Sequence, residues 1–255
     1  MDDVLFCTLT NNGYANYTLN CLASLDKIGL KDRLHVYCTD KTSFDRIRAN
    51  HENTHLFEQT IIDTTNRPGM IKFDDEGFGD TMVLKMRVVH HCLTLAKYVL
   101  FTDGDIVYYR TGFIEYLLKN IGDNNILIQN DKAEGHVSSG DKKPVCCAGF
   151  MFIKKTDVTL SMYDMDTVDP FYKDIISTSN RGGNFDDQIY LRRLRNEHNG
   201  VTKMILLPSC MFPTYFVVKS RLNLANWDDK YLLHYNYLIG DAKKKTMVNR
   251  RDWLI

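Results

Sequence analysis

The stretch LFTDGDIVYY, residues 100–109, is the starting point for interpreting the rest of the chain. Residues 98–101 are apolar, aromatic or β-branched and predict a short buried strand, which ends at Asp103 and Asp105 before apolar residues resume. Because such strands are covered on both faces, we expect the two carboxylates at the C-terminal edge of the sheet, where α/β folds bind ligands. Carboxylates on either side of the permissive Gly104 can share one divalent cation. The alternative is a surface turn, since Asp-Gly-Asp is also a good turn sequence.

The composition is that of an ordinary globular protein. Of the 255 residues, 44% are hydrophobic and 25% are charged, which suits one α/β domain with a substantial core. Lys plus Arg equals Asp plus Glu at 32 each, so charge does not suggest nucleic acid as a partner. The N-terminus lacks a signal-peptide pattern, and no apolar run approaches the roughly 20 residues of a membrane span. Seven cysteines, mostly in apolar segments, predict buried thiols in a reducing compartment, and we therefore expect a cytoplasmic protein.

The first part of the chain alternates between strand and helix patterns. Strands are predicted at 4–9, 33–39 and 55–62, with helices at 14–28 and 42–47 between them. This alternation predicts a parallel sheet, with residues 1–105 as a nucleotide-binding half.

Polar residues directly after the first two strands are candidates for nucleotide binding. They are Thr10, Asn11, Tyr14 and Asp40, which we expect to contact a base and ribose. The alternative is that they cap helices and form solvated turns. No G-x-G-x-x-G follows the first strand, which argues against a dinucleotide cofactor.

A loop rich in Gly and Asp, residues 68–80, precedes a helix predicted from Asp80 or Thr81 to Ala96. Lys85 falls beside the apolar stripe of this helix and away from its other polar residues. We expect Lys85 to reach a phosphate near the strand ends. The alternative is that it extends along the apolar surface to solvent.

The second part of the chain carries fewer clear elements. A helix is predicted at 111–120, a loop at 132–143 and a helix at 185–196, together with strands at 126–128, 146–153 and 202–207, the last of which is the last clear strand. The glycine inside the second of these strands, Gly149, indicates close approach of a ligand or backbone. Asp186 and Asp187 open the helix at 185–196, where acidic residues also serve as caps and complements of the helix dipole.

Four motifs in order resemble a known family. They are Asp103-Gly104-Asp105, Gly149-Phe150-Met151, Asp187-Gln188 and His234-x-Asn236-x-x-x-Gly240-x-x-x-Lys244. This pattern resembles the nucleotide-diphospho-sugar transferases of the GT-A fold, which include xylosyl-, arabinosyl- and galactosyltransferases and small enzymes of large DNA viruses. The resemblance covers most of the chain. It implies a Rossmann-like, mostly parallel α/β sheet flanked by helices, with a smaller acceptor-side sheet. Residues 106–255 would then form the donor-sugar and acceptor half of a single domain spanning residues 1–255.

The resemblance also implies roles for individual residues. Asp103, Asp105 and His234 would ligate a divalent metal, with Mn²⁺ better suited than Mg²⁺ to an imidazole ligand. Lys244, with Lys243 as its substitute, would hold a diphosphate in a loop shaped by Asn236 and Gly240. Other residues would line the donor-sugar pocket: Asp131, Gly149, Asp187 and Gln188. Cys147-Ala148 stands where relatives often have a polar residue, which leaves the donor sugar open.

The implied reaction needs positive charge and, in one form, a base. A departing nucleoside diphosphate is a polyanion, which a divalent cation and lysines can neutralise. An inverting reaction needs a general base, for which the candidates are Asp187, Asp186, Asp80, Asp75 and Asp74. A retaining reaction needs no such base and would place Gln188 near the anomeric carbon. We expect a UDP-sugar donor, such as UDP-xylose or UDP-galactose, and a glycan or glycoprotein acceptor.

Two other functions fit part of the pattern. Asp103-Gly104-Asp105-Ile106-Val107 resembles the nucleophile motif of the aspartate-nucleophile (HAD-like) phosphatases, although there the motif normally follows the first strand. The other alternative is a non-catalytic protein that binds sugar nucleotides. The phosphatase leaves His234-x-Asn236 and Asp187-Gln188 unexplained, whereas the binding protein would bind nucleotide with metal and show no turnover.

Overall fold

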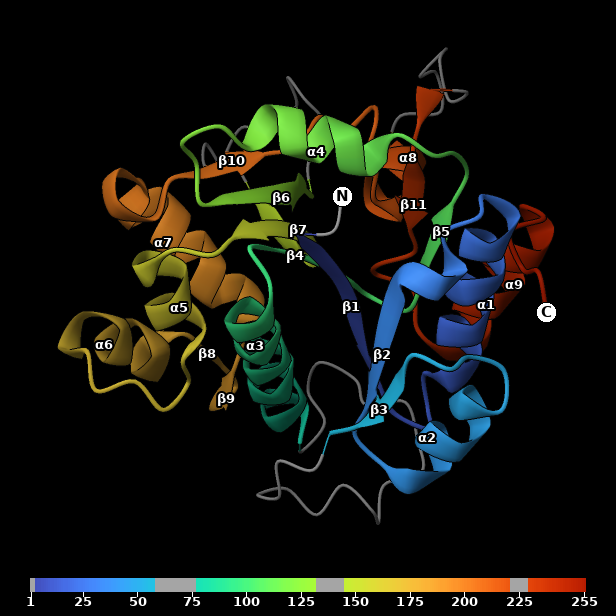
Figure 1. Ribbon diagram of the computed structural model, residues 1–255, viewed down its shortest axis with the longest axis horizontal. Helices are drawn as coiled ribbons and strands as arrows, with labels where there is room; N and C mark the ends of the chain where they lie inside the picture. The colour runs from blue at the N-terminus through green and yellow to red at the C-terminus, as the bar shows by residue number, and fades with distance from the viewer. Residues whose placement is uncertain (1–2, 58–76, 132–144, 221–228) are drawn as a thin grey trace.

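The computed structural model describes residues 3–57, 77–131, 145–220 and 229–255. Helices lie on both sides of a central seven-stranded sheet (Figure 1). The strand order is β10-β6-β7-β4-β1-β2-β3. The strands are β1 (Val4–Thr10), β2 (Leu34–Cys38), β3 (Thr54–Leu56), β4 (Tyr98–Thr102), β6 (Ile126–Asn130), β7 (Cys146–Lys154) and β10 (Met204–Leu206). Only β7 runs antiparallel to its neighbours β4 and β6, so the predicted α/β class with a mostly parallel sheet is confirmed.

Successive residues of the central strands face opposite layers of helices, as the two-residue period of a strand requires. Phe6 and Leu100 pack with α1, α2 and α4, whereas Cys7 and Phe101 pack with α3, α5, α6 and α7. The helices of the first layer are α1 (Ala15–Lys27), α2 (Lys41–Arg48) and α4 (Phe113–Ile121), and a short 3₁₀ turn, η1 (Lys31–Arg33), precedes β2. Those of the second layer are α3 (Phe78–Leu95), α5 (Asp157–Tyr163), α6 (Pro170–Thr178) and α7 (Asp187–Thr202). None of the described helices is both long and apolar enough to span a membrane.

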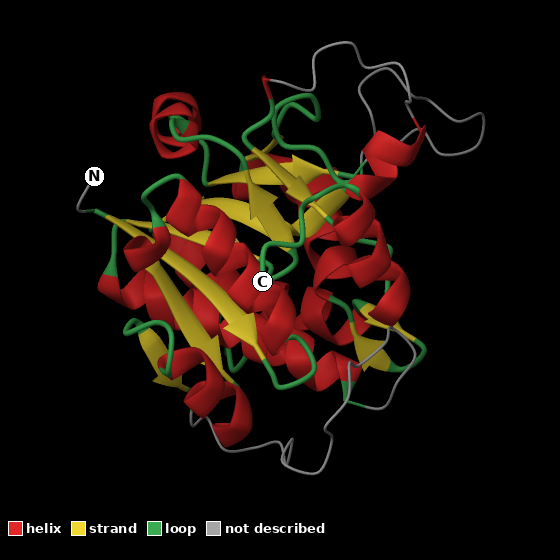
Figure 2. Cartoon of the chain, turned by 90° about the vertical axis from the view of Figure 1, so that its right-hand side faces the viewer, coloured by secondary structure: helices red, strands yellow, loops and turns green. Residues whose placement is uncertain are grey.

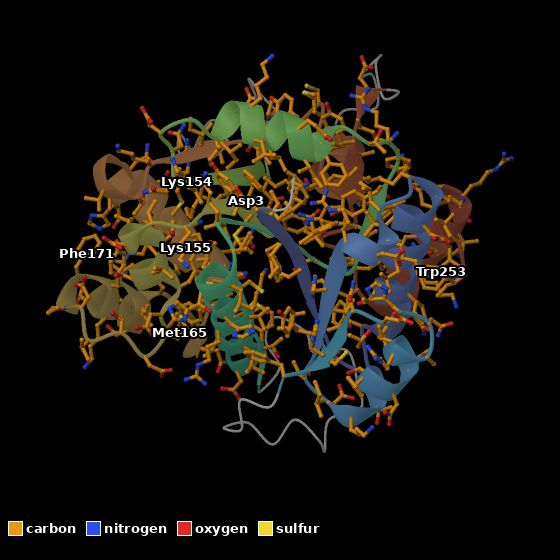
Figure 3. All side chains as sticks on the ribbon, viewed as in Figure 1. Asp3, Lys154, Lys155, Met165, Phe171 and Trp253 are labelled. Carbon is orange, nitrogen blue, oxygen red and sulfur yellow. The ribbon has the colours of Figure 1, made fainter. Side chains whose placement is uncertain are left out.

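A smaller sheet brings the C-terminal segment to the end of β4. Strand β5 (Ile106–Tyr108) pairs antiparallel with β11 (Leu232–His234), and this register places His234 opposite Ile106. Helices α8 (Tyr215–Ser220) and α9 (Gly240–Asn249) lie before and after β11, and β8 (Asn180–Arg181) pairs with β9 (Asn184–Phe185) in a short hairpin. The C-terminus lies on the same side of the molecule as α1 and α9 (Figures 1 and 2). Trp253 lies there too (Figure 3), with its ring centroid 5.6 Å from that of Tyr17 on α1.

Several predicted boundaries differ from the observed ones. Helix α3 begins at Phe78, earlier than predicted, because Gly77 takes the left-handed conformation (φ 88°) that starts it. Strand β3 ends at Leu56, and residues 58–62 of its predicted range lie outside the described residues. The predicted loop at 132–143 and most of the one at 68–80 also lie outside them.

Several elements were not predicted, and most of them are short. Helices α5, α6 and α8 have seven, nine and six residues, strand β5 and the turn η1 have three each, and the β8–β9 hairpin has two residues per strand. Helix α9 stands where a diphosphate loop was predicted. The helix was missed because its only buried residues are Lys243 and Met247 and its sequence shows almost no apolar stripe.

Candidate active site

Asp103 and Asp105 follow the end of β4, as the sequence predicts, and the turn between them is packed against α1. The backbone N–H of Asp103 donates to the carbonyl of Gly149 on β7, at 2.7 Å. A Cβ on Gly104 would lie 2.4 Å from Oγ1 of Thr18, so this position requires glycine. Asp105 is buried and Asp103 is partly exposed. The surface-turn alternative is therefore wrong.

His234 completes a group of three side chains whose ligand atoms all lie within 4.8 Å of one another. Its Nε2 atom is 3.2 Å from Oδ1 of Asp105 and 3.6 Å from Oδ2 of Asp103. A Cβ on Gly149 would lie 2.1 Å from Cε1 of His234 and 2.6 Å from Oδ2 of Asp103. The glycine predicted from the strand pattern is thus what allows the imidazole and the carboxylate to meet.

Two buried lysines flank these carboxylates. Nζ of Lys85 lies 2.9 Å from Oδ2 of Asp187 and 3.4 Å from Oδ1 of Asp103. Burial lowers the pKa of Lys85, but the charges of Asp103 and Asp187 outweigh burial and raise the pKa above its ordinary value. Lys243 pairs with Oδ2 of Asp105. Burial opposes the ionisation of Asp105, but the charge of Lys243 beside it holds the pKa of this carboxyl well below the ordinary range.

The donor set fits a divalent cation. Oδ1 of Asp105 is buried and accepts no hydrogen bond from the described residues, although Nε2 of His234 is close to it. The separations of 3.2 and 3.6 Å match neighbouring ligands of one ion, because bonds of about 2.1 Å place adjacent ligands roughly 3 to 3.5 Å apart. Two carboxylates and one imidazole suit a borderline ion such as Mn²⁺.

A cavity of about 590 Å³ opens in front of this group. Its lining includes the predicted nucleotide residues Thr10, Asn11 and Tyr14 together with Asp187 and Gln188. Lys85, Lys243, Gly149 and Asn236 line it as well. The cavity therefore brings together most of the residues that the four sequence motifs contribute.

Asp131 lies behind the cavity wall and organises it. Its carboxylate accepts hydrogen bonds from Nδ2 of Asn236 (2.7 Å), Oη of Tyr237 (2.5 Å) and Nε2 of Gln188 (3.3 Å). Asp131 is buried and is not among the lining residues, in contrast to the predicted contact with the donor sugar. In this structure it positions the three side chains instead.

Residues 29–248 match the family described as nucleotide-diphospho-sugar transferase. The chain belongs to this family. The match confirms the resemblance drawn from the four motifs and favours a transferase over an aspartate-nucleophile phosphatase.

Individual relatives agree with this membership. UDP-galactose:fucoside alpha-3-galactosyltransferase of Dictyostelium discoideum is 27% identical over 277 residues, a match that covers 95% of this chain and 41% of that protein. The chain thus spans less than half the length of this relative.

Two solved structures show the shared fold. Mouse xyloside xylosyltransferase 1 in its apo form has a TM-score of 0.56 at 12% identity, over 93% of this chain and 100% of that one. A glycosyltransferase involved in glycosylation of the major capsid of PBCV-1 has a TM-score of 0.53 at 8% identity, over 96% and 98% of the two chains. These likenesses confirm the predicted GT-A fold.

Four residues predicted to bind nucleotide or to catalyse do not line the cavity of this family member. Asp40 caps α2, where its carboxylate accepts from the N–H groups of Ser43 and Asn12, both at 2.8 Å. Asp80 is exposed in the first turn of α3. Lys244 is exposed, with Nζ 4.8 Å from the ring centroid of Trp253. Gly240 starts α9, and its carbonyl accepts from Oη of Tyr17 at 3.0 Å.

The other base candidates are also placed by the structure or lie beyond it. Asp186 is the N-cap of α7, accepting from the N–H of Ile189, and it pairs with Arg181 at 2.9 Å. This arrangement is the capping role that the sequence offered as the alternative. Asp74 and Asp75 lie outside the described residues. Among the described residues, Asp187 is therefore the one base candidate that lines the cavity. It is also linked to Asp103, because Lys85 pairs with both carboxylates.

Sequence reasoning missed residues that the structure places at the site. Gln129 is fully buried beneath His234, and Tyr237 lines the cavity with φ of 61°, an uncommon conformation for a residue other than glycine. Gln129 comes two residues before Asp131 and Tyr237 directly follows Asn236, two residues to which the family resemblance gave roles. That adjacency was the only signal the sequence offered.

Proposed function

We propose that this chain transfers a sugar from a nucleoside-diphosphate donor to a glycan or glycoprotein acceptor, with Mn²⁺ or Mg²⁺ as cofactor. The observation that carries the proposal is the group of Asp103, Asp105 and His234, which faces the cavity between two buried lysines. A UDP-sugar such as UDP-galactose or UDP-xylose is the proposed donor, supported by the UDP-galactose named for the Dictyostelium relative.

In this proposal the acidic side chains and the imidazole bind the cation, and a lysine binds the diphosphate. Asp103, Asp105 and His234 would hold the divalent cation. When bound there, the cation supplies positive charge against the departing diphosphate. Lys243 carries a second positive charge beside Asp105, and in this proposal its ammonium contacts the diphosphate oxygens. Thr10, Asn11 and Tyr14 line the part of the cavity assigned to the nucleoside.

Asp187 and Gln188 face the part of the cavity assigned to the sugar. Asp187 is held by Lys85 at 2.9 Å, which fixes its carboxylate next to Asp103. The amide nitrogen of Gln188 donates to Asp131 and to the carbonyl of Cys146, so the carbonyl oxygen is the polar atom that remains for substrate. In an inverting reaction Asp187 would accept the proton of the acceptor hydroxyl, and in a retaining one the Gln188 oxygen would lie near the anomeric carbon.

Calorimetric titration of UDP and GDP, with and without Mn²⁺, tests the proposal, followed by a screen for hydrolysis of UDP-galactose, UDP-xylose and UDP-glucose. We expect UDP to bind tightly only with metal and at least one UDP-sugar to be cleaved. The anomeric configuration of the transferred sugar, read by NMR, then decides between Asp187 as a base and Gln188 as a stabilising group. Metal-dependent UDP binding with no turnover of any donor would favour a non-catalytic binding protein. Cleavage of simple phosphomonoesters without UDP binding would contradict the proposal outright.

A cytoplasmic location is part of the same proposal. All seven cysteines are thiols, and six of them are buried, which suits a reducing compartment. Fractionation of the native host cell checks the location independently of activity.

A further inference from the structure

Gln129, at the end of β6, lies directly under the metal-binding group although no motif includes it. The side chain is fully buried. Its Nε2 atom donates to the carbonyls of Phe212 (3.0 Å) and Pro213 (3.1 Å), and its Oε1 atom lies 2.9 Å from Nδ1 of His234. All the hydrogen-bonding atoms of this buried amide are therefore engaged, and one of them touches a proposed metal ligand.

The two carbonyls fix which way the amide points. If the amide were turned by 180°, Oε1 would face two carbonyl oxygens at hydrogen-bonding distance, and two acceptors repel each other. Oε1 must therefore face His234, and since Oε1 can only accept, Nδ1 must carry the ring proton. The other group close to Nδ1 is Sγ of Cys147 at 3.4 Å, which is a much weaker acceptor.

In the neutral ring, a proton on Nδ1 leaves a lone pair on Nε2. That atom faces Oδ1 of Asp105 at 3.2 Å and Oδ2 of Asp103 at 3.6 Å. Three acceptor atoms then converge on one point, an arrangement that favours a cation between them. The buried Oδ1 of Asp105, which accepts no hydrogen bond from the described residues, agrees with an unprotonated Nε2.

The backbone at Gln129 departs from regular pairing at this point. Ile128 of β6 is opposite Met151 of β7, but the next residue, Gln129, is opposite Cys147, so the register shifts between them. The extra residues of β7 include Gly149, the glycine that packs against His234. Irregularities of this kind re-aim side chains next to functional sites. The same register shift thus places Gln129 and makes room for the imidazole of His234 at Gly149.

We propose that Gln129 is a positioning residue that holds His234 as the Nδ1–H tautomer, with Nε2 bare for a divalent cation. This inference rests on the metal site of the proposed function but concerns a residue outside the motifs. It predicts a tautomer that exists before any metal or nucleotide is bound.

The test is ¹⁵N NMR of the metal-free protein labelled at histidine, at about pH 8, where an ordinary imidazole is neutral. The His234 signals are assigned by their loss in His234→Asn. We expect wild-type His234 to be protonated at Nδ1 and bare at Nε2. In Gln129→Met, which keeps the volume but removes every hydrogen bond, we expect a shift toward the Nε2–H tautomer and Mn²⁺ binding about 10- to 100-fold weaker, measured by calorimetry.

Two further variants separate positioning from general damage. Gln129→Glu keeps an oxygen that accepts from Nδ1. As the neutral acid that burial favours, it also keeps an O–H donor for one of the two carbonyls, and it should restore the tautomer and Mn²⁺ affinity to within about threefold of wild type. Phe212→Leu loosens the same part of the core without altering the carbonyls or the amide, and it should lower the melting temperature with tautomer and Mn²⁺ affinity unchanged.

Three results would overturn the proposal: an Nε2–H tautomer in the wild type, a folded Gln129→Met with wild-type tautomer and affinity, or an equal loss of Mn²⁺ affinity in Phe212→Leu. If Gln129→Met does not fold, the wild-type tautomer and Gln129→Glu still decide. Failure of the proposed function looks different, because the tautomer and Mn²⁺ binding would then be as described while no sugar nucleotide is cleaved.

Discussion

Histidines occur in two polar clusters of this protein that differ in what their ring nitrogens face. At the edge of the sheet, Nδ1 of His35 on β2 lies 3.0 Å from Nε2 of His55 on β3, with the ring planes only 4° apart. Each of these nitrogens therefore has the other as its partner. At the end of β4, by contrast, Nε2 of His234 faces two carboxylate oxygens, and one of them accepts no hydrogen bond from the described residues.

The comparison shows what marks a binding site among buried polar groups. The edge pair satisfies itself, and burial lowers the pKa of both His35 and His55, so neutral rings are favoured there. The His234 group instead gathers fixed charges of both signs and leaves acceptor atoms facing one another. A cluster whose polar atoms satisfy one another needs no ligand. A cluster whose acceptor atoms converge on one point favours a cation between them.

The largest expected effect breaks the cation group itself. Asp105→Asn keeps the shape but removes the charge, and Mn²⁺-dependent UDP affinity should fall by at least about 100-fold, since even outer-shell changes at metal sites cost about 10- to 100-fold. Calorimetry measures it. The matched variant in the other cluster, His55→Gln, should bind UDP within about twofold of wild type. Retained metal-dependent binding in Asp105→Asn would refute the metal assignment.

Next in size is Gly149→Ala, which forces His234 and Asp103 apart. The new Cβ would lie 2.1 Å from the imidazole, so we expect Mn²⁺ affinity to fall by about tenfold or more and the melting temperature to drop. Gly200→Ala is the control, because nothing lies within 4 Å of its Cβ. It should leave binding unchanged and leave stability equal or higher by roughly 0.5–1 kcal/mol. Equal binding in both variants would show that the close approach at Gly149 is not needed.

A smaller effect distinguishes two adjacent lysines. Lys243→Met removes a buried charge beside Asp105 and should weaken UDP binding in Mn²⁺ by about tenfold, the value of one charge-assisted hydrogen bond. Lys244→Met should change it by less than about twofold, because that side chain is exposed beside Trp253. The reverse order would restore Lys244 as the diphosphate ligand that the motif implies.

The smallest effect belongs to the edge pair and appears in stability against pH. A histidine whose pKa is lower in the folded than in the unfolded protein binds more protons when unfolded. The free energy of unfolding therefore rises with pH up to about 6.5, and the stability contributed by the neutral ring is lost as the pH falls below that value. His55→Gln removes one such group and should flatten this rise between about pH 5 and 7, as measured by urea unfolding. An unchanged slope would mean that the pair does not stay neutral in the folded protein.

The fold was predictable because its signals are local. Apolar runs gave most strands of the main sheet, and the three- and four-residue periodicity gave α1, α3 and the start of α7. Helices α5 and α6 are short and α9 has weak apolar periodicity, and all three form because neighbouring elements cover their few apolar residues. Asp40 and Asp186 show the same limit, since a residue at a helix start can cap the helix or face a ligand, and here both cap.

The functional side chains can be recognised from the sequence alone: an Asp pair behind a buried strand, a glycine inside another strand, Lys85 beside an apolar stripe, and a late histidine. These features follow from spacing along one element, which a sequence records directly. Which of them meet depends on the packing of elements that are distant in the sequence. Pairing of β11 with β5 brings His234 to the Asp pair, and Lys243 rather than Lys244 enters the site because consecutive helical residues point about 100° apart. The role of Gln129 could be recognised only in the folded protein. Its hydrogen-bond partners lie 83, 84 and 105 positions away in the sequence, and only packing brings such distant groups into contact.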